Sequence, residues 1–218
     1  MSADTTIREV RTTLLRLPWP DDPWLAHHPL GATRDLVVVE VETQSGITGM
    51  GYLHMLNLPL LRTIGACLEE AMAPRVVGRD ATAVEAIWHD LWRATITAGR
   101  GGIAMMAISA LDIALWDAVG KRAELPLHRL WGHYRSSIPA YGSGCFRGSR
   151  GDGMIAKARR YVGQGYKAIK MQVAHVGDLR TDLDNVRRMR EAVGPDVEIM
   201  IDVNMGWSAD TAIQMGRN

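Results

Sequence analysis

Two short apolar runs in the last third of the chain constrain its fold most. Residues 166–173 and 197–204 each alternate apolar side chains with other types, as expected of a strand buried on one face. The interval from Lys170 in the first run to Asp202 in the second is close to one strand-helix-strand unit, roughly 30 residues. The pattern therefore predicts two neighbouring parallel strands with a cation and a carboxylate at matching ends.

The surrounding sequence continues this alternation of strands and helices. The further predicted elements are a strand over 138–142 and helices over 152–164, over 179–193 and from Ser208 onward. Such alternation is typical of a parallel sheet. Because α/β barrels carry their chemistry where the strands end, Lys170 and Asp202 become candidate active-site residues.

The first part of the chain follows a different pattern. The predicted elements are strands over 7–17, 35–43 and 47–55, then helices over 59–73, behind Thr82 and over 103–119. Gly46 is expected to supply the turn of a hairpin, and Thr82 with Glu85 reads as a capping box. Gly120 is expected to stop the long apolar helix, in which Asp112 and Asp117 are interpreted as structural anchors.

Composition limits the possible partners and the compartment. The 218 residues include 25 basic and 24 acidic side chains, which predicts neither a nucleic-acid nor a membrane partner. An apolar content of 47% supports a packed core. Cys67 and Cys145 are interpreted as free thiols, and the chain start has no signal-peptide pattern, so a cytoplasmic metabolic protein is expected.

Several stretches resemble a known family. The run 103–121, followed by Leu-Pro at 125–126 and Leu-Trp-Gly at 130–132, resembles the end of the capping domain of mandelate racemase-like enzymes in the enolase superfamily. The strands holding Lys170 and Asp202 resemble that family's second and third barrel strands. The resemblance covers essentially the whole chain and points to the acid-sugar dehydratase branch, which includes talarate/galactarate dehydratase-like proteins.

This resemblance implies an α/β fold. An α+β capping domain, residues 1–135, would precede the first three βα units of a modified TIM barrel, residues 136–218. It also implies removal of a proton beside a substrate carboxylate, with Mg²⁺ stabilising the resulting enediolate. The acid-sugar substrate would bind between cap and barrel, and the resemblance further implies a homo-oligomer.

The resemblance also assigns roles to individual residues. Asp202 would be a metal ligand, Asn204 its polar neighbour at the substrate, and Lys170 the group that stabilises charge on the substrate carboxylate. The candidate substrate-binding residues in the cap are Trp24, His28, Tyr52 and His54.

Gln172 departs from the family pattern. The family usually has Lys-x-Lys on this strand, with the second lysine as general base, whereas this chain has Lys170-Met-Gln172. An amide cannot act as a base near neutral pH. Racemisation needs an acid-base group on each face of the carbon, whereas dehydration can use one, so Gln172 favours a hydro-lyase. A racemase or epimerase stays an alternative if His175 replaces the lysine.

Length is the second departure. A complete barrel of this type takes about 250 residues, and far fewer follow residue 135. We therefore expect the C-terminal barrel half to supply the remaining metal carboxylates and a histidine base, and the isolated chain to be inactive. The last alternative is a non-catalytic fragment or assembly partner.

Overall fold

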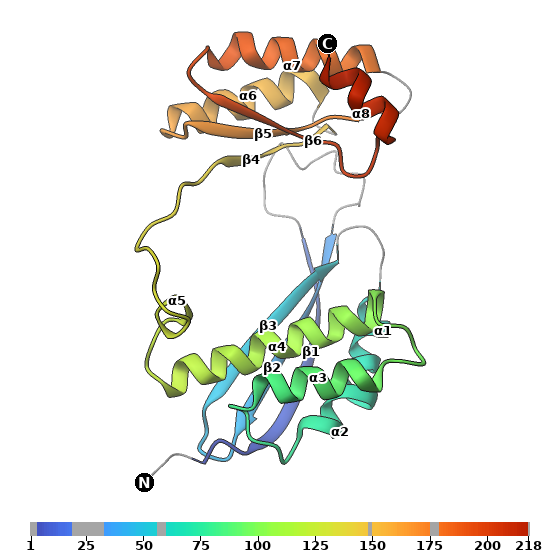
Figure 1. Ribbon diagram of the computed structural model, residues 1–218, viewed down its shortest axis with the longest axis vertical. Helices are drawn as coiled ribbons and strands as arrows, with labels where there is room; N and C mark the ends of the chain where they lie inside the picture. Colours follow the sequence, from blue (N-terminus) through green and yellow to red (C-terminus); the bar gives the residue numbers. More distant parts are fainter. Residues whose placement is uncertain (1–3, 19–32, 56–59, 148–149, 175–178, 218) are drawn as a thin grey trace. The chain divides into compact units, whose positions relative to one another are not determined.

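The computed structural model describes residues 4–18, 33–55, 60–147, 150–174 and 179–217, which form two compact units (Figure 1). The first unit extends to Ser136, and the second contains the residues from Ser137 onward. Each unit has its own apolar core.

A three-stranded antiparallel sheet forms the base of the first unit. Its strands are β1 (Ile7–Pro18), β2 (Thr33–Thr43) and β3 (Thr48–Met55), in that spatial order. The predicted hairpin between β2 and β3 is confirmed, and Gly46 at its turn has a φ of 82°. Alternate residues of β2, among them Val37, Val39 and Val41, are fully buried, which places the core on one face of the sheet.

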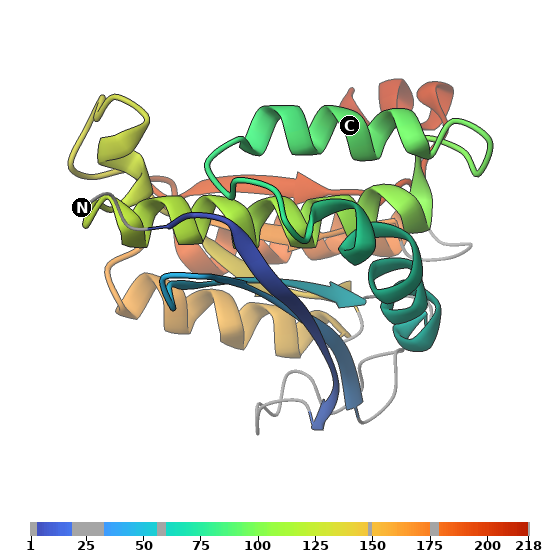
Figure 2. The same cartoon turned by 90° about the horizontal axis from the view of Figure 1, so that it is seen from below.

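Helices cover that face of the sheet (Figure 2). They are α1 (Leu61–Ala66), the π-helical η1 (Cys67–Met72), α2 (Ala73–Val76), α3 (Val84–Ala94) and α4 (Gly102–Arg122). The short α5 (Leu127–Leu130) follows α4 and has no buried residue. α4 lies along β3 at very short range. A Cβ on Gly49 would lie 2.0 Å from the Ala114 carbonyl oxygen, and one on Gly51 would lie 2.1 Å from that of Ala110. Only glycine allows this approach of strand and helix.

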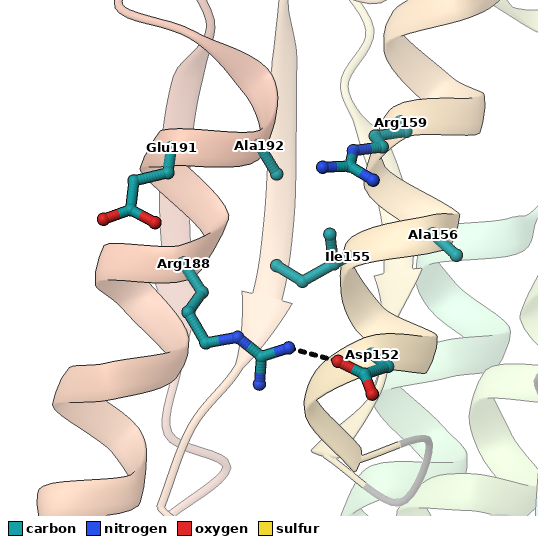
Figure 3. Close-up of a pocket in the computed structure, with 7 residues that line it drawn as sticks. All are labelled: Asp152, Ile155, Ala156, Arg159, Arg188, Glu191 and Ala192. Carbon is teal, nitrogen blue, oxygen red and sulfur yellow. Dashed lines mark hydrogen bonds and ion pairs between the residues drawn. The ribbon is translucent and has the colours of Figure 1, made fainter.

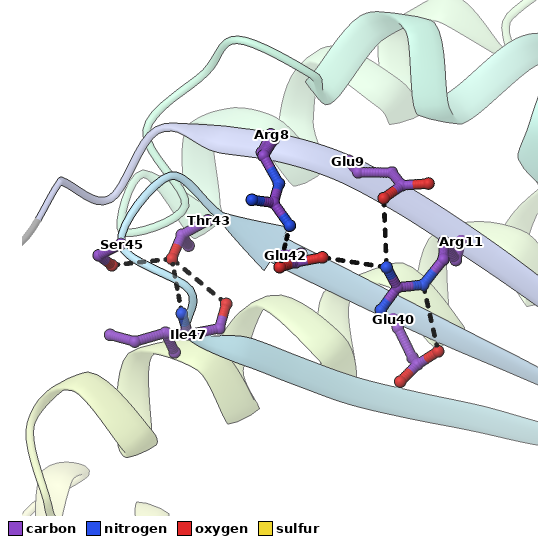
Figure 4. Close-up of polar contacts among 8 residues, drawn as sticks. All are labelled: Arg8, Glu9, Arg11, Glu40, Glu42, Thr43, Ser45 and Ile47. Carbon is purple, nitrogen blue, oxygen red and sulfur yellow. Dashed lines mark hydrogen bonds and ion pairs between the residues drawn. The ribbon is translucent and has the colours of Figure 1, made fainter.

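The opposite face of the sheet is charged near the β2–β3 turn. Arg8 pairs with Glu42, and the Arg11 guanidinium lies 3.0 Å from Glu42 and 3.2 Å from Glu9 (Figure 4). The same guanidinium is 3.6 Å from Glu40. These ion pairs place charged side chains on the face that the helices leave uncovered.

Two predicted helix signals of the first unit are wrong. The Thr82 hydroxyl does not cap α3; it donates to the Asp80 carboxylate at 2.8 Å. Gly120 does not stop α4, which continues to Arg122 and ends where Glu124 adopts a φ of 53°. A side chain at Gly120 would instead crowd Leu127, so that glycine serves packing.

By length and composition alone, α4 could cross a membrane. In the structure it is the central core helix of the first unit, where it packs against β2 and β3. The structural reading of Asp117 is confirmed, because its carboxylate accepts the Met50 N–H at 2.8 Å and pairs with Lys121 at 2.7 Å.

The second unit is built from parallel βα units. Its elements are β4 (Gly142–Cys145), α6 (Arg150–Gly163), β5 (Ala168–Gln172), α7 (Leu179–Val193), β6 (Glu198–Asp202) and α8 (Ala209–Gly216). The strands pair in parallel in the order β4-β5-β6, and α6 and α7 cover one face (Figure 1). The expected fold class, an α+β unit followed by parallel βα units, is confirmed.

One strand of the second unit was predicted too early. β4 begins at Gly142, whereas residues 138–141 pair with no described strand and Ile138 is 77% exposed. The helix over 179–193 has the predicted limits, and Ser208 caps α8 by accepting the Thr211 N–H at 3.2 Å. Cys67 and Cys145 are free thiols, as expected.

Candidate functional site

The two faces of β5 divide structural from candidate functional residues. Ile169 and Met171 are fully buried beneath the helices of the second unit. Lys170 and Gln172 point to the opposite face and are partly exposed. The alternation that predicted these faces is therefore confirmed for this strand.

Lys170 and Asp202 meet across β5 and β6. The Lys170 Nζ lies 3.2 Å from the Asp202 Oδ2, and the two side chains are 28% and 30% exposed. The Lys170 ammonium also lies 5.7 Å from the ring centre of Tyr141, just before β4. Strands β5 and β6 and the residue just before β4 thus contribute to one polar cluster.

Gln172 is the residue directly opposite Asp202 in the β5–β6 register, and Lys170 is the diagonal neighbour. The Gln172 side chain makes no hydrogen bond to another residue in the described ranges. A neutral amide therefore occupies the position beside the carboxylate where the resemblance leads one to expect a lysine.

Asn204 completes the end of β6. Its backbone N–H donates to the Asp202 Oδ1 at 3.0 Å, and its φ of 43° lies in the left-handed region. Asparagine tolerates this conformation better than most residues. The turn thus places the Asn204 backbone next to the Asp202 carboxylate, and the role of the Asn204 side chain at the substrate stays a prediction.

The Asp202 carboxylate is held in its charged form. The Asn204 N–H lowers the pKa of Asp202 most, followed by the hydrogen bond from Lys170, and burial opposes both only in part. An ionised carboxylate at a strand end is a suitable ligand for Mg²⁺. The described residues contain no cluster of three or more metal-binding side chains. The chain as described thus fits Mg²⁺ through one carboxylate ligand.

Sequence reasoning missed three residues beside this cluster. Tyr141 faces the Lys170 ammonium, Arg147 donates to the carbonyl groups at the end of β5, and Asp182 accepts the Ala174 N–H. The burial of Asp182 was predictable from its spacing on α7. It lies on the same buried stripe as Asn185, Met189 and Val193. A carboxylate on a core-facing stripe predicts a specific buried partner.

Two of the other predicted substrate residues belong to the first unit. Tyr52 and His54 belong to β3 of the first unit, where Tyr52 is 58% exposed and His54 is partly buried. Burial and the charge of Arg34 lower the pKa of His54. Trp24, His28 and His175 fall outside the described residues. Their contact with substrate stays a prediction.

A groove of about 380 Å³ lies between α6 and α7 (Figure 3). Arg188 and Asp152 form an ion pair across it, and its apolar floor includes Ile155. The groove belongs to the helical layer, whereas Lys170 and Gln172 lie on the opposite face of the sheet. The two sites are therefore distinct.

Family models match both units. Residues 9–132 match the mandelate racemase/muconate lactonizing enzyme N-terminal domain, and residues 153–218 match the enolase C-terminal domain-like family. The domain boundaries predicted from sequence, 1–135 for the capping domain and 136–218 for the barrel part, stay a prediction.

Curated relatives and solved structures agree with these matches. A 3,6-anhydro-alpha-L-galactonate cycloisomerase from Streptomyces coelicolor is 36% identical over 97% of this chain and 58% of its own length. The L-talarate/galactarate dehydratase of Salmonella typhimurium is 33% identical over 84% of this chain and 45% of its own. The chain thus spans about half the length of these relatives.

A crystal structure of a racemase from Streptomyces coelicolor A3(2) with bound magnesium superposes with a TM-score of 0.87. It is 37% identical, and the match covers 97% of this chain and 58% of that one. Both the sequence matches and the structural match extend over nearly the whole chain. The chain therefore belongs to the mandelate racemase/muconate lactonizing enzyme family of the enolase superfamily.

Proposed function

We propose that this chain supplies the cap and the first barrel strands of a Mg²⁺-dependent acid-sugar dehydratase. The observation that carries the proposal is the Lys170–Asp202 pair at the ends of β5 and β6, with Gln172 opposite the carboxylate. The dehydratase among its relatives supports an acid sugar as the substrate class.

Each residue of the cluster would have a separate task. Lys170 would place its ammonium group where negative charge develops on the substrate carboxylate as the α-proton leaves. Asp202 would hold Mg²⁺ through a carboxylate oxygen, and the metal, when bound, supplies Lewis-acid stabilisation of that charge. Asn204 would hydrogen-bond a substrate oxygen next to the metal ligand, because its backbone fixes it beside Asp202.

Gln172 would bind substrate without exchanging a proton. An amide both donates and accepts hydrogen bonds, so it can orient a hydroxyl group of a sugar acid. With no base on this face, proton removal and return would both occur on the other face of the carbon. Elimination of a β-hydroxyl group is compatible with one-sided proton transfer, whereas racemisation is not.

A cycloisomerase is the second candidate. It is favoured by the relative that is 36% identical, which is itself a cycloisomerase. If a ring oxygen were the leaving group in place of a hydroxyl, the same one-sided proton chemistry would open a ring. The product would then have the mass of the substrate, whereas a dehydratase product would have lost one water.

The rest of the active site would come from outside these 218 residues. One carboxylate alone binds Mg²⁺ weakly, because this cation prefers several oxygen ligands in octahedral geometry. We propose that turnover needs the remaining barrel strands, and that the complete protein is a homo-oligomer. If no complete barrel gives turnover, a non-catalytic assembly role becomes the better account.

The test is a chimera. This chain would be joined to the corresponding C-terminal segment of the Streptomyces coelicolor relative and assayed with Mg²⁺ on a panel of aldarates, aldonates and anhydro-sugar acids. We expect a product lighter by one water. Lys170→Met should lower kcat by at least about 100-fold, whereas Lys167→Met, an exposed lysine three residues away, should not. An epimer as the main product would refute the proposal.

A further inference from the structure

Ala174, just past the end of β5, has a backbone conformation that needs outside support. Its φ is 66°, in the left-handed region that L-residues with a Cβ adopt only at a cost. Its side chain is 6% exposed, so the conformation is not a solvated loop feature. Strained residues of this kind persist where neighbouring groups hold them, and they concentrate at functional sites.

Two charged side chains hold this residue from opposite ends. The Ala174 N–H donates to the Asp182 Oδ2 at 2.9 Å, and the Asp182 side chain is fully buried. The Arg147 guanidinium donates to the carbonyl oxygens of Val173 and Ala174 at 3.1 and 3.2 Å. Hydrogen bonds to charged groups are stronger than neutral ones. Because Asp182 lies on α7 and Arg147 follows β4, two distant segments hold the turn after β5.

The same turn also contacts the end of β6. The Val173 N–H donates to the Asp202 carbonyl oxygen at 3.0 Å and so ties the end of β5 to the candidate metal ligand. Gly206 lies against Ala174 so closely that a Cβ on it would be 2.5 Å from the Ala174 Cβ.

We propose that Arg147 and Asp182 are positioning residues that fix the turn after β5 and thereby the placement of Lys170 and Gln172 relative to Asp202. This clamp, defined as Arg147, Ala174 and Asp182, touches no reacting atom. Its catalytic meaning rests on the proposed function, but its structural effect does not. A misplacement of about 1 Å at an active site can cost on the order of 100-fold in rate.

Amide hydrogen exchange of the 218-residue chain, followed by NMR, tests the structural effect. In Asp182→Ala we expect the Ala174 and Val173 amides to exchange at least about tenfold faster than in the parent, because a charge-assisted hydrogen bond is lost. The Met189 amide, inside α7, reports any loss of stability of the whole unit. Asp182→Asn keeps an acceptor oxygen and should restore most of the protection.

Two further variants complete the design. Arg147→Gln leaves Asp182 intact and should accelerate the same two amides. Asp184→Ala is the matched control, since it removes an exposed carboxylate on the same helix that pairs only with Arg187 in the described structure. Equal acceleration at Met189 and Val173 would mean general destabilisation and overturn the proposal. An effect confined to Ala174 would overturn it as well, because the change would not reach Asp202.

Kinetics of the chimera test the catalytic meaning separately. Asp182→Ala should lower kcat by about 10-fold to 100-fold with little change in KM, and Asp182→Asn should recover most of the rate. If the chimera has no activity, the proposed function fails while the exchange result still decides whether the clamp exists. If exchange changes as expected but kcat does not, the positioning role is refuted.

Discussion

The Asp202 carboxylate accepts hydrogen bonds from one backbone N–H and one ammonium group, and both favour its ionised form. An aspartate in an unfolded chain has a pKa of about 3.9. Since the folded pKa lies lower, the ionised group contributes stability that is complete above the unfolded value and is lost as pH falls through the folded pKa. We therefore expect Asp202→Asn to flatten the acid limb of the stability curve.

Urea unfolding of the parent and Asp202→Asn at a series of pH values, from neutral to the acid side of the unfolded pKa, checks this expectation. Lys170→Met should retain part of the acid dependence, because the Asn204 N–H still donates to the carboxylate. At neutral pH the loss of the Lys170 pair should cost less than about 1 kcal/mol, as for other partly exposed ion pairs. Identical acid limbs in parent and Asp202→Asn would contradict the assignment.

His54 on β3 should make the stability of the folded chain depend on pH in a second range. Burial, followed by the positive charge of Arg34, lowers its pKa below the usual value of about 6.5. The unfolded chain then binds a proton before the folded one does, so stability falls as pH drops from about 6.5 toward the folded pKa. His54→Gln should remove this fall and leave the alkaline side unchanged. Thermal melts in buffers on both sides of pH 6.5 would reveal it, and an unchanged slope would count against the burial argument.

At the scale of elements, the contact between α4 and β3 depends on two glycines. A Cβ on Gly51 would lie 2.1 Å from the Ala110 carbonyl oxygen and 2.8 Å from the Ala114 nitrogen. Backbone atoms cannot rotate away, so α4 itself would have to move. We expect Gly51→Ala to lower the free energy of unfolding by about 1–3 kcal/mol or more, as measured by chemical denaturation.

Gly163→Ala is the control for this substitution. Gly163 is in the last turn of α6, and a Cβ there would meet nothing within 4 Å. The alanine should therefore be neutral or stabilise the helix by up to about 1 kcal/mol. If both substitutions had the same small effect, the close approach of α4 to β3 would not be required for stability.

How far the sequence predicts these elements depends on the range of the interactions that fix them. The alternation around Lys170 follows from one strand and one buried face, so it was predictable. The prediction of a capping box was wrong because the Thr82 hydroxyl donates to the Asp80 carboxylate instead. Residue types alone do not show which of two nearby partners such a hydroxyl binds. The predicted start of β4 at residue 138 was wrong because strand pairing with β5 begins only at Gly142, opposite Ile169. The roles of Arg147 and Asp182 depend on contacts between distant segments, which no periodicity encodes.

At the scale of the whole molecule, the two units have separate cores of different size. Among the described residues, the core of the first unit contains 18 buried apolar residues and that of the second contains 10. Both units expose large apolar side chains, among them Trp131 at 60% in the first and Ile201 at 49% in the second. The smaller core buries less apolar surface and therefore stabilises its unit less.

We therefore expect the chain to unfold in two steps, with the second unit unfolding at the lower denaturant concentration. Hydrogen exchange with mass spectrometry at increasing urea would show peptides of α6, α7 and β5 losing protection before those of α4. Gly51→Ala should move only the later step, because it disturbs only the core of the first unit. Adding the C-terminal segment in the chimera should move only the earlier step upward, since the surface around Ile201 would then be covered. A single transition shared by both units, shifted equally by either change, would contradict separate cores.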